Sequence, residues 1–141
     1  MNRLITLVGI GFALFFLSCT PTSPTKNDNM ATTTTPEKEL RHVVLFKFKE
    51  GVSADSLKAM EMAFKALATQ IKEVKHLEFG LNNSPENLNQ GFTHCFLVTF
   101  ATEKDREIYL PHPAHKAFVD NHLKTILDKV CVVDYWSDVV K

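Results

Sequence analysis

Three segments of this chain are apolar on both sides of an extended backbone, and this pattern limits the possible folds more than any other feature. The segments are residues 41–49, 92–102 and 129–138. Successive side chains of a strand point to opposite faces, so one face of a sheet built from these strands carries His42, Val44, Phe46, Phe48, His94, Phe96, Val98, Phe100, Val130, Val132, Asp134 and Trp136. The other face carries Val43, Leu45, Thr93, Cys95, Leu97, Thr99, Cys131, Val133 and Tyr135. A sheet with one face in water alternates apolar and polar residues, so we expect both faces of this sheet to be covered.

The remaining segments supply two longer helices and one more strand. The first helix follows a cap at Ser53 or Ser56, runs to about residue 73, and has an apolar stripe at helical spacing formed by Leu57, Met60, Phe64, Leu67, Ala68 and Ile71. We predict a strand at 74–81, a short helical turn at 103–110 and the second helix at 114–127. The order βαββαβ is that of a ferredoxin-like α+β fold with a four-stranded antiparallel sheet. Two helices cover one face only, so we expect a homodimer in which a second copy covers the other.

Polar residues of this fold should meet at one end of the helix-covered face. The first strand lies between the third and the fourth and runs antiparallel to both, so His42 should lie near Asp134. The chain leaves the third strand towards Tyr109, and His115 then opens the second helix on the face of Phe118, after a turn that contains two prolines. These polar residues would line a cavity whose apolar walls are Val44, Phe46, Phe64, Phe96, Phe118 and Val132. His94 falls at the opposite end of the sheet.

Tyr109 and His115 are the candidates for catalysis. A neutral imidazole is a usable base near neutral pH, and a buried phenol donates a hydrogen bond to a developing enolate oxygen. Asp134 could fix the tautomer of a histidine. This pair suits proton abstraction beside a carbonyl, aldol-type ring closure or isomerisation. The alternative is that these polar residues satisfy one another over a small cavity, or that the cavity binds a ligand without turnover.

Several other functions find no support in the sequence. Basic and acidic residues number sixteen each, so nothing favours binding to nucleic acid. His112, His115 and His122 have no carboxylate that would complete a metal site, and neither a glycine-rich phosphate loop nor an activated serine motif is present. We therefore predict no metal and no cofactor.

The first residues resemble an export signal. Arg3 precedes an apolar run over residues 4–17 that is too short and wrongly flanked for a stable membrane span. The run ends in Phe16-Leu17-Ser18-Cys19, which resembles a bacterial lipobox with Cys19 as the lipidated residue. Residues 1–18 are therefore predicted to be a lipoprotein signal peptide, and the mature protein to be anchored in a bacterial cell envelope. An ordinary secretory signal and an uncleaved anchor are the alternatives.

Residues 19–39 are predicted to be a disordered tether, because they are rich in threonine and proline and have no apolar period. The folded domain then comprises residues 40–141. Cys95 and Cys131 lie on strands that are not neighbours in the predicted sheet. We expect two buried free thiols, although the export signal makes a disulfide permissible.

Three motifs in this order resemble the stress-responsive A/B barrel (Dabb) family, a branch of the dimeric α+β barrels. They are residues 41–52 (RHVVLFKFKEGV), Gly91-Phe92-Thr93-His94 followed by Val98-Thr99-Phe100, and Tyr109…His112-Pro113…His115…Phe118-Val119. The resemblance covers about residues 41–136 and implies the same ferredoxin-like fold and dimer. A plant polyketide cyclase of this family uses the tyrosine and the histidine at the positions of Tyr109 and His115 as its acid–base pair, and a histidine like His42 lines its pocket.

Two hypotheses follow for the function. The first is an envelope-anchored, dimeric binding domain that holds a small, mostly apolar or aromatic ligand between sheet and helices. The second is a cofactor-independent cyclase, lyase or isomerase that acts on a carbonyl compound through Tyr109 and His115.

Overall fold

A computed structural model describes residues 38–138 of the chain. The predicted signal peptide, Cys19 and nearly all of the predicted tether lie outside the described residues. The elements are β1 (Leu40–Phe48), α1 (Ala54–Gln70), β2 (His76–Leu81), β3 (His94–Phe100), α2 (Glu103–Tyr109), α3 (Pro113–Phe118), the π-helical turn η1 (Val119–Leu123) and β4 (Leu127–Trp136). Among the described residues, no helix combines the length and the apolar character that crossing a membrane requires.

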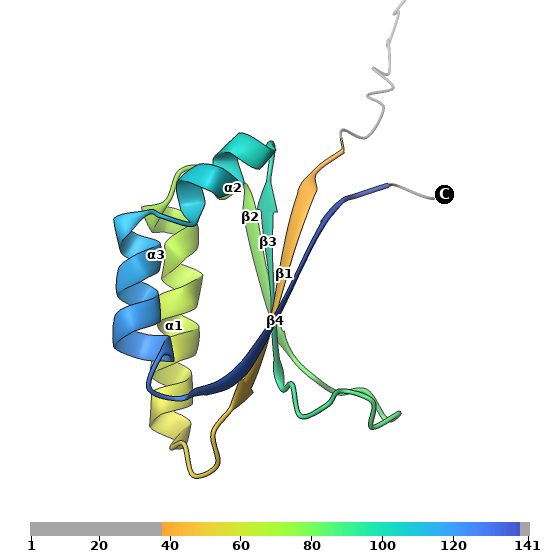
Figure 1. Cartoon of the computed structure of the whole chain (residues 1–141), viewed down its shortest axis with the longest axis vertical. Coiled ribbons are helices and arrows are strands. Elements are labelled where there is room, and N and C mark those ends of the chain that lie inside the picture. Colours follow the sequence, from red (N-terminus) through yellow and green to blue (C-terminus); the bar gives the residue numbers. More distant parts are fainter. Residues whose placement is uncertain (1–37, 139–141) are drawn as a thin grey trace, which may run out of the picture. The chain divides into compact units, whose positions relative to one another are not determined.

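The four strands form one antiparallel sheet in the order β2-β3-β1-β4, which confirms the ferredoxin-like prediction (Figure 1). The start of β1 lies beside the ends of both neighbours. His42 is opposite Val98 on β3 and opposite Asp134 on β4. The polar end of the sheet is therefore assembled from residues that are up to ninety-two positions apart in the sequence.

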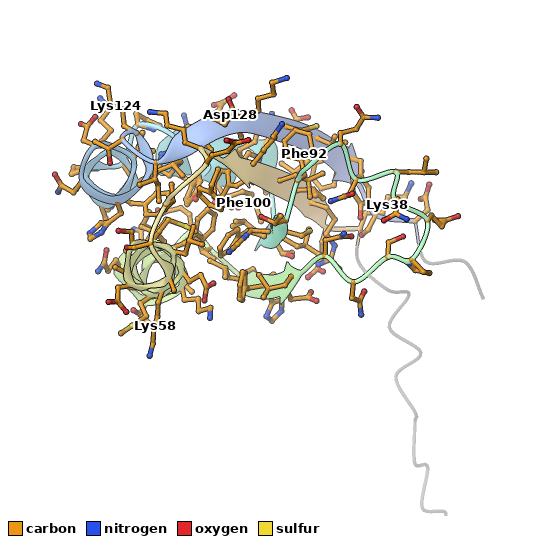
Figure 2. All side chains as sticks on the ribbon, turned by 90° about the horizontal axis from the view of Figure 1, so that it is seen from below. Lys38, Lys58, Phe92, Phe100, Lys124 and Asp128 are labelled. Atoms are coloured by element: carbon orange, nitrogen blue, oxygen red, sulfur yellow. The ribbon has the colours of Figure 1, made fainter. Side chains whose placement is uncertain are left out.

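The helices cover one face of the sheet, which we call the inner face (Figure 1). Side chains fill the space between helices and sheet, while charged side chains such as Lys58 and Lys124 point away from it (Figure 2). The core consists of Leu40, Val44, Phe46, Met60, Phe64, Leu67, Ile71, Val74, Phe96, Val98, Phe100, Tyr109, Phe118 and Leu123. Its centre is a stack of Phe64 on Phe96, with ring centroids 3.9 Å apart. Burying aromatic side chains of this size is among the largest favourable contributions to folding.

The caps of the first two helices follow from local sequence. The hydroxyl of Ser53 accepts a hydrogen bond from the backbone N–H of Ser56 and caps α1, as predicted. Thr102 and Asp105 form a reciprocal capping box that starts α2. Helix α1 ends at Gln70, about one turn earlier than predicted.

The second predicted helix differs from expectation. Pro113 occupies the first turn of α3, where its missing N–H costs no hydrogen bond. After Phe118 the helix widens into η1, in which the N–H of Lys124 reaches the carbonyl of Val119, five residues back. The wider turn rotates the following side chains, so Leu123 is buried and His122 is exposed. His122 nevertheless lines a small hollow against α1 together with Phe118. The helical segment ends at Leu123 instead of residue 127.

The opposite face, which we call the outer face, carries no helix of the described chain (Figure 1). Cys95 on β3 and Cys131 on β4 both lie opposite Leu45 of β1, which separates them. Both thiols are free, as predicted, but they are half-buried and not fully buried, because no helix of the described chain covers this face. Edge strand β4 is the most exposed part of the sheet, with Val132 on the inner face 49% exposed and Val133 on the outer face 50% exposed.

The first two described residues, Lys38 and Glu39, belong to the segment that was predicted to be the tether. Glu39 forms ion pairs with Arg41 at 2.9 Å and with Lys75 at 2.8 Å, and its backbone N–H donates to the hydroxyl of Ser137. These contacts hold Glu39 against the end of β4, so the ordered domain includes the last residues before position 40.

Candidate functional site

A cavity of about 380 Å³ lies between the inner face of the sheet and the helices. Its walls are His42, Val44, Phe46, Phe64, Tyr109, Leu110, His115, Phe118, Val119, Leu123, Leu127, Val130, Val132 and Asp134. Every residue that the sequence nominated for this site is among them except Phe96. That side chain is fully buried behind the wall and contacts Phe64, so it supports the cavity without lining it.

The polar residues of the cavity gather at one end of it. Nδ1 of His42 lies 2.6 Å from a carboxylate oxygen of Asp134. The ring of Tyr109 lies between two imidazoles, with centroid distances of 6.1 Å to His42 and 4.6 Å to His115. Phe46, Phe64 and Phe118 line the cavity deeper along the sheet and the helices. One cavity thus combines a polar end with an apolar remainder.

The proline turn determines how His115 is presented. Nδ1 of His115 lies 2.9 Å from the carbonyl oxygen of Leu110, at the end of α2. A carbonyl oxygen only accepts, so Nδ1 carries the proton and Nε2 of the neutral ring keeps its lone pair. Before α3, Nδ1 of His112 accepts a hydrogen bond from the N–H of Ala114, which fixes the start of this helix. His112 is therefore a cap and His115 a side chain of the cavity.

Burial acts on both candidate catalytic groups. Desolvation lowers the pKa of His115; the hydrogen bond to Leu110 opposes this effect, and the neighbouring His42 and His112 add to it. The imidazole is therefore neutral near pH 7 and able to accept a proton. Desolvation raises the pKa of Tyr109 far above its ordinary value, so the phenol keeps its proton and acts as a donor. The two side chains are thus in complementary protonation states.

Arg106 is a residue of this region that the sequence analysis missed. Its Nη1 lies 3.1 Å from the second carboxylate oxygen of Asp134. A signal was available, since Arg106 precedes Tyr109 by three residues and therefore lies on the same side of α2. The sequence analysis also did not nominate Leu110, Val119, Leu123, Leu127 and Val130.

His94 lies at the other end of the sheet, as predicted. It is opposite Phe46 and Leu81, its Nε2 is 3.3 Å from Glu61, and its ring packs edge-on against Phe48. Burial lowers the pKa of His94, and the hydrogen bond to Glu61 opposes this. The side chain does not line the cavity of about 380 Å³. Within residues 38–138, no group of three or more His, Cys, Asp or Glu side chains is arranged to hold a metal ion.

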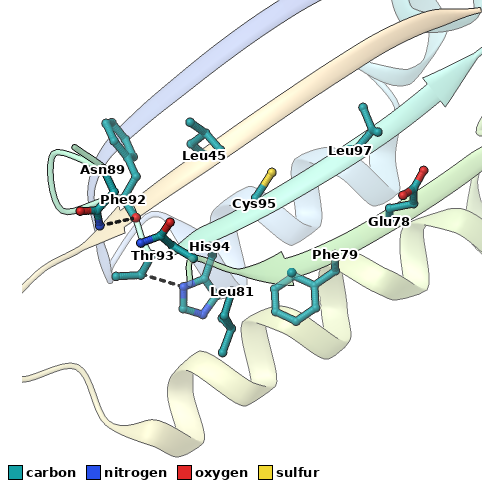
Figure 3. A pocket seen from close by; sticks show the side chains of 12 residues that line it. Leu45, Glu78, Phe79, Leu81, Asn89, Phe92, Thr93, His94, Cys95 and Leu97 are labelled. Carbon is teal, nitrogen blue, oxygen red and sulfur yellow. Dashed lines mark hydrogen bonds between the residues drawn. The ribbon is translucent and has the colours of Figure 1, made fainter. Parts of the chain in front are cut away.

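A second hollow, of about 590 Å³, lies on the outer face beneath the loop between β2 and β3 (Figure 3). Leu45, Cys95 and Leu97 point into it from the sheet, whereas Phe79 and His94 point to the side of α1 (Figure 3). The loop is fixed by a hydrogen bond from the side-chain amide of Asn89 to the carbonyl of Phe92. This hollow is larger than the inner cavity, but neither Tyr109 nor His115 lines it.

The antiparallel sheet, its single helical layer and the cavity between them define a ferredoxin-like α+β domain. Residues 40–137 match the Stress responsive A/B Barrel Domain (Dabb) family, and the chain belongs to that family. The motifs that suggested this family are therefore confirmed.

Known relatives include plant and bacterial proteins. The chain is 38% identical over 96 residues to the stress-response A/B barrel domain-containing protein HS1 of Arabidopsis thaliana, covering 68% of this chain and 87% of the relative. It is 26% identical over 96 residues to olivetolic acid cyclase of Cannabis sativa, covering 68% of this chain and 94% of the cyclase. A dimeric protein of unknown function with a ferredoxin-like fold from Bacteroides fragilis superposes with a TM-score of 0.56 at 26% identity, over 69% of this chain and 94% of that one.

The lowered pKa values of His94 and His115 predict a pH-dependent stability. Below about pH 6.5 the unfolded chain binds protons at these positions more readily than the native one, so the free energy of unfolding should fall as the pH drops through the lowered values. Urea unfolding between about pH 7.5 and pH 5.5 measures this loss. Because glutamine does not titrate, the double variant His94→Gln/His115→Gln should lose less stability over this range. An identical loss in the variant would show that other groups cause it.

Proposed function

We propose that this protein binds a small, mostly apolar molecule with a carbonyl group in the cavity between sheet and helices. The observation that carries this proposal is the distribution of polarity along the cavity. Hydrogen-bonding groups from His42, Tyr109 and His115 gather at one end, while Phe46 and Phe118 are among the hydrophobic walls. A ligand with an apolar body and one polar group fits this distribution.

The volume of the cavity and the protonation states of its polar side chains narrow the class of ligand. Ligand cavities typically measure about 300–1,000 Å³, so a volume of about 380 Å³ suits a small molecule near the lower limit. The phenol of Tyr109 is a donor, and a carbonyl oxygen is an acceptor that it can bind. The neutral imidazole of His115 adds no positive charge that would favour an anion. A neutral carbonyl compound is therefore the best match.

A second candidate function is catalysis on the bound carbonyl compound. It is favoured by the tautomer of His115, which has Nε2 available as a base beside a protonated Tyr109. Removal of a proton next to the carbonyl by His115, with hydrogen bonding of the enolate oxygen by Tyr109, would be the first step of a cyclase, lyase or isomerase reaction without a cofactor. The similarity to olivetolic acid cyclase, at 26% identity, supports this class of chemistry.

The ketone 2-nonanone tests binding and proton abstraction together. Ligand-observed NMR should detect its binding to the native protein. Val132→Trp should abolish this binding, because the indole fills the cavity from β4. Ile108→Trp, a control on the exposed side of α2, should leave it unchanged. If the control and Val132→Trp bind equally well, the ligand does not occupy this cavity.

The same ketone in D₂O distinguishes the binder from the enzyme. Catalysis should exchange the hydrogens next to the carbonyl, and His115→Gln should slow this exchange by about 10²–10⁴-fold because it removes the base. Tyr109→Phe should slow it by about 10²–10³-fold, because it removes one donor to the enolate oxygen. Binding without exchange above the buffer rate would support the binding domain and reject the enzyme.

We further propose that the protein is a homodimer formed through the outer face. Leu45, Leu97 and Val133 give this face an apolar surface that no described part of the chain covers. A typical specific interface buries about 800 Å² per partner, which is comparable to one face of a four-stranded sheet. The dimeric Bacteroides fragilis protein, at 26% identity, supports a homodimer. The hollow beneath the β2–β3 loop would then lie at the interface.

Leu97→Glu should dissociate this dimer. The substitution introduces a buried charge into each half of the interface at a cost of several kcal/mol. Sedimentation velocity at micromolar concentration should show a dimer for the native protein and a monomer for the variant. Met62→Glu, on an exposed position of α1, is the control that should remain dimeric. A native protein that sediments as a monomer would contradict the proposal.

We also propose that Cys19 is lipidated and anchors the domain in a bacterial cell envelope, with residues 1–18 removed as the signal peptide and the following segment serving as the tether. The series of Arg3, an apolar run and Cys19 supports this. Cys19→Ala should move the protein from the membrane fraction to the soluble fraction of the envelope, while the control Cys131→Ala stays in the membrane. A Cys19→Ala protein that is still processed and still membrane-bound would contradict lipidation.

A further inference from the structure

A hydrogen-bonded chain of three side chains lies at the end of the sheet away from the polar end of the inner cavity. Oγ1 of Thr93 is 2.8 Å from Nδ1 of His94 (Figure 3). Nε2 of the same ring is 3.3 Å from a carboxylate oxygen of Glu61 on α1. Thr93 is exposed, whereas the imidazole side chain is 7% exposed and the carboxylate side chain 22%. None of the three residues lines the inner cavity, so the cluster is separate from the site described above.

The two hydrogen bonds have defined directions. A carboxylate only accepts hydrogen bonds, so Nε2 of His94 donates to Glu61. Burial lowers the pKa of His94, so the ring is neutral near pH 7 and Nδ1 keeps its lone pair. The hydroxyl of Thr93 is therefore the donor to Nδ1. The second oxygen of Glu61 lies 3.9 Å from Nζ of Lys65, the other charged group that contacts this carboxylate.

A hydroxyl that donates to an imidazole, which in turn donates to a carboxylate, is the arrangement that activates a hydroxyl as a nucleophile. Such an arrangement acts on a substrate only where the hydroxyl borders a space that the substrate can enter. Thr93 lines the hollow of about 590 Å³ on the outer face, together with the apolar side chains of Leu45, Phe92 and Leu97. The hydroxyl is thus next to a space that fits a small apolar compound.

An amide donor lies beside the hydroxyl. The backbone N–H of Asn82 donates to the carbonyl of Thr93 at 2.9 Å, which places the two residues side by side, and Asn82 also lines the hollow. Its Oδ1 accepts the N–H of Ser84, and its Nδ2 has no hydrogen-bond partner within residues 38–138. A side-chain amide in this position can donate to the negative oxygen that forms when a hydroxyl attacks a carbonyl group.

We propose that Thr93, His94 and Asn82 form a second catalytic site that hydrolyses small, mostly apolar carboxylic esters in this hollow, with Glu61 as a positioning residue. Oγ1 of Thr93 attacks the ester carbonyl carbon, and its proton passes to Nδ1 of His94. The bond to the leaving oxygen then breaks, and that oxygen takes the proton from His94. Water attacks the acylated Thr93 in the same way, which releases the acid and returns the proton to Oγ1.

The site is compatible with the proposed dimer. Thr93 precedes the first residue of β3, so it lies at the end of the outer face, and Leu97 of the proposed interface lies four residues farther along. At about 3.3 Å per residue, this separation is about 13 Å. A small ester therefore reaches Thr93 from the end of the sheet on the side of the β2–β3 loop.

The native protein is tested first, with 4-nitrophenyl butyrate as the substrate. It should release 4-nitrophenolate faster than buffer does. Diisopropyl fluorophosphate transfers its phosphoryl group to activated hydroxyls with loss of fluoride, so it should stop this release, and mass spectrometry should find the label on Thr93. Absence of release above the buffer rate, or a label on other residues only, overturns the proposal. This measurement needs no variant.

Variants then test the roles of the hydroxyl and the imidazole. Thr93→Val removes the hydroxyl at nearly the same volume and should reduce the release to the buffer rate, whereas Thr93→Ser should keep it. His94→Gln should slow the release by about 10²–10⁴-fold, because it removes the base. Thr69→Val, an exposed threonine of α1, is the control that should match the native protein. A folded Thr93→Val variant with the native rate overturns the proposal, and the fluorophosphate label decides where this variant does not fold.

The remaining two residues have separate signatures. Glu61→Gln should lower kcat with little change in KM, because the amide can donate to Nε2 and so favours the tautomer in which Nδ1 carries the proton. Asn82→Ala should slow the release by about 10²–10³-fold, because it removes the donor to the oxyanion. Glu107→Gln, an exposed position of α2, is the control that should keep the native kinetics. A purely structural role for Glu61 would leave kcat of the folded variant unchanged, and this result overturns its positioning role.

Discussion

The antiparallel pairing of β1 with β4 is the interaction on which the rest of the structure depends. It sets His42 opposite Asp134 and Val44 opposite Val132, and so builds one wall of the cavity from segments that are far apart in the chain. A shift by one residue would turn every side chain of β4 to the other face of the sheet. The bond between His42 and Asp134 and the ion pair to Arg106 would then be lost together, and with them the polar end of the cavity.

The other wall depends on how the chain turns after α2. Two prolines prevent a continuous helix, and the break leaves the carbonyl of Leu110 free to accept a hydrogen bond from the Nδ1–H of His115. The π-helical turn then buries Leu123 and brings it to the cavity wall, while His122 stays exposed. A regular helix at this point would present a different set of side chains to the sheet. The protonated phenol and the neutral imidazole are therefore neighbours because of a local irregularity.

The two faces of the sheet differ in what covers them. The inner face combines a packed core with a cavity, and Val132 of edge strand β4 borders this cavity and is half exposed. The outer face is apolar and carries the two free thiols on either side of Leu45. The proposed subunit interface and the proposed ligand site therefore use different side chains of one four-stranded sheet.

The sequence by itself determined the fold class, the strand order and most of the cavity wall, because strand alternation and helical spacing are local periodicities that a core must obey. It also brought His42, Asp134, Tyr109 and His115 to one end, since antiparallel order follows from the arrangement of the elements. Only the tertiary structure decided that Phe96 lies behind the wall, that the chain widens into η1 after Phe118 and that Arg106 reaches Asp134. These outcomes depend on side-chain packing and on distances between separate elements. Strand alternation and helical spacing do not predict these distances, because the distances arise only when the elements pack together.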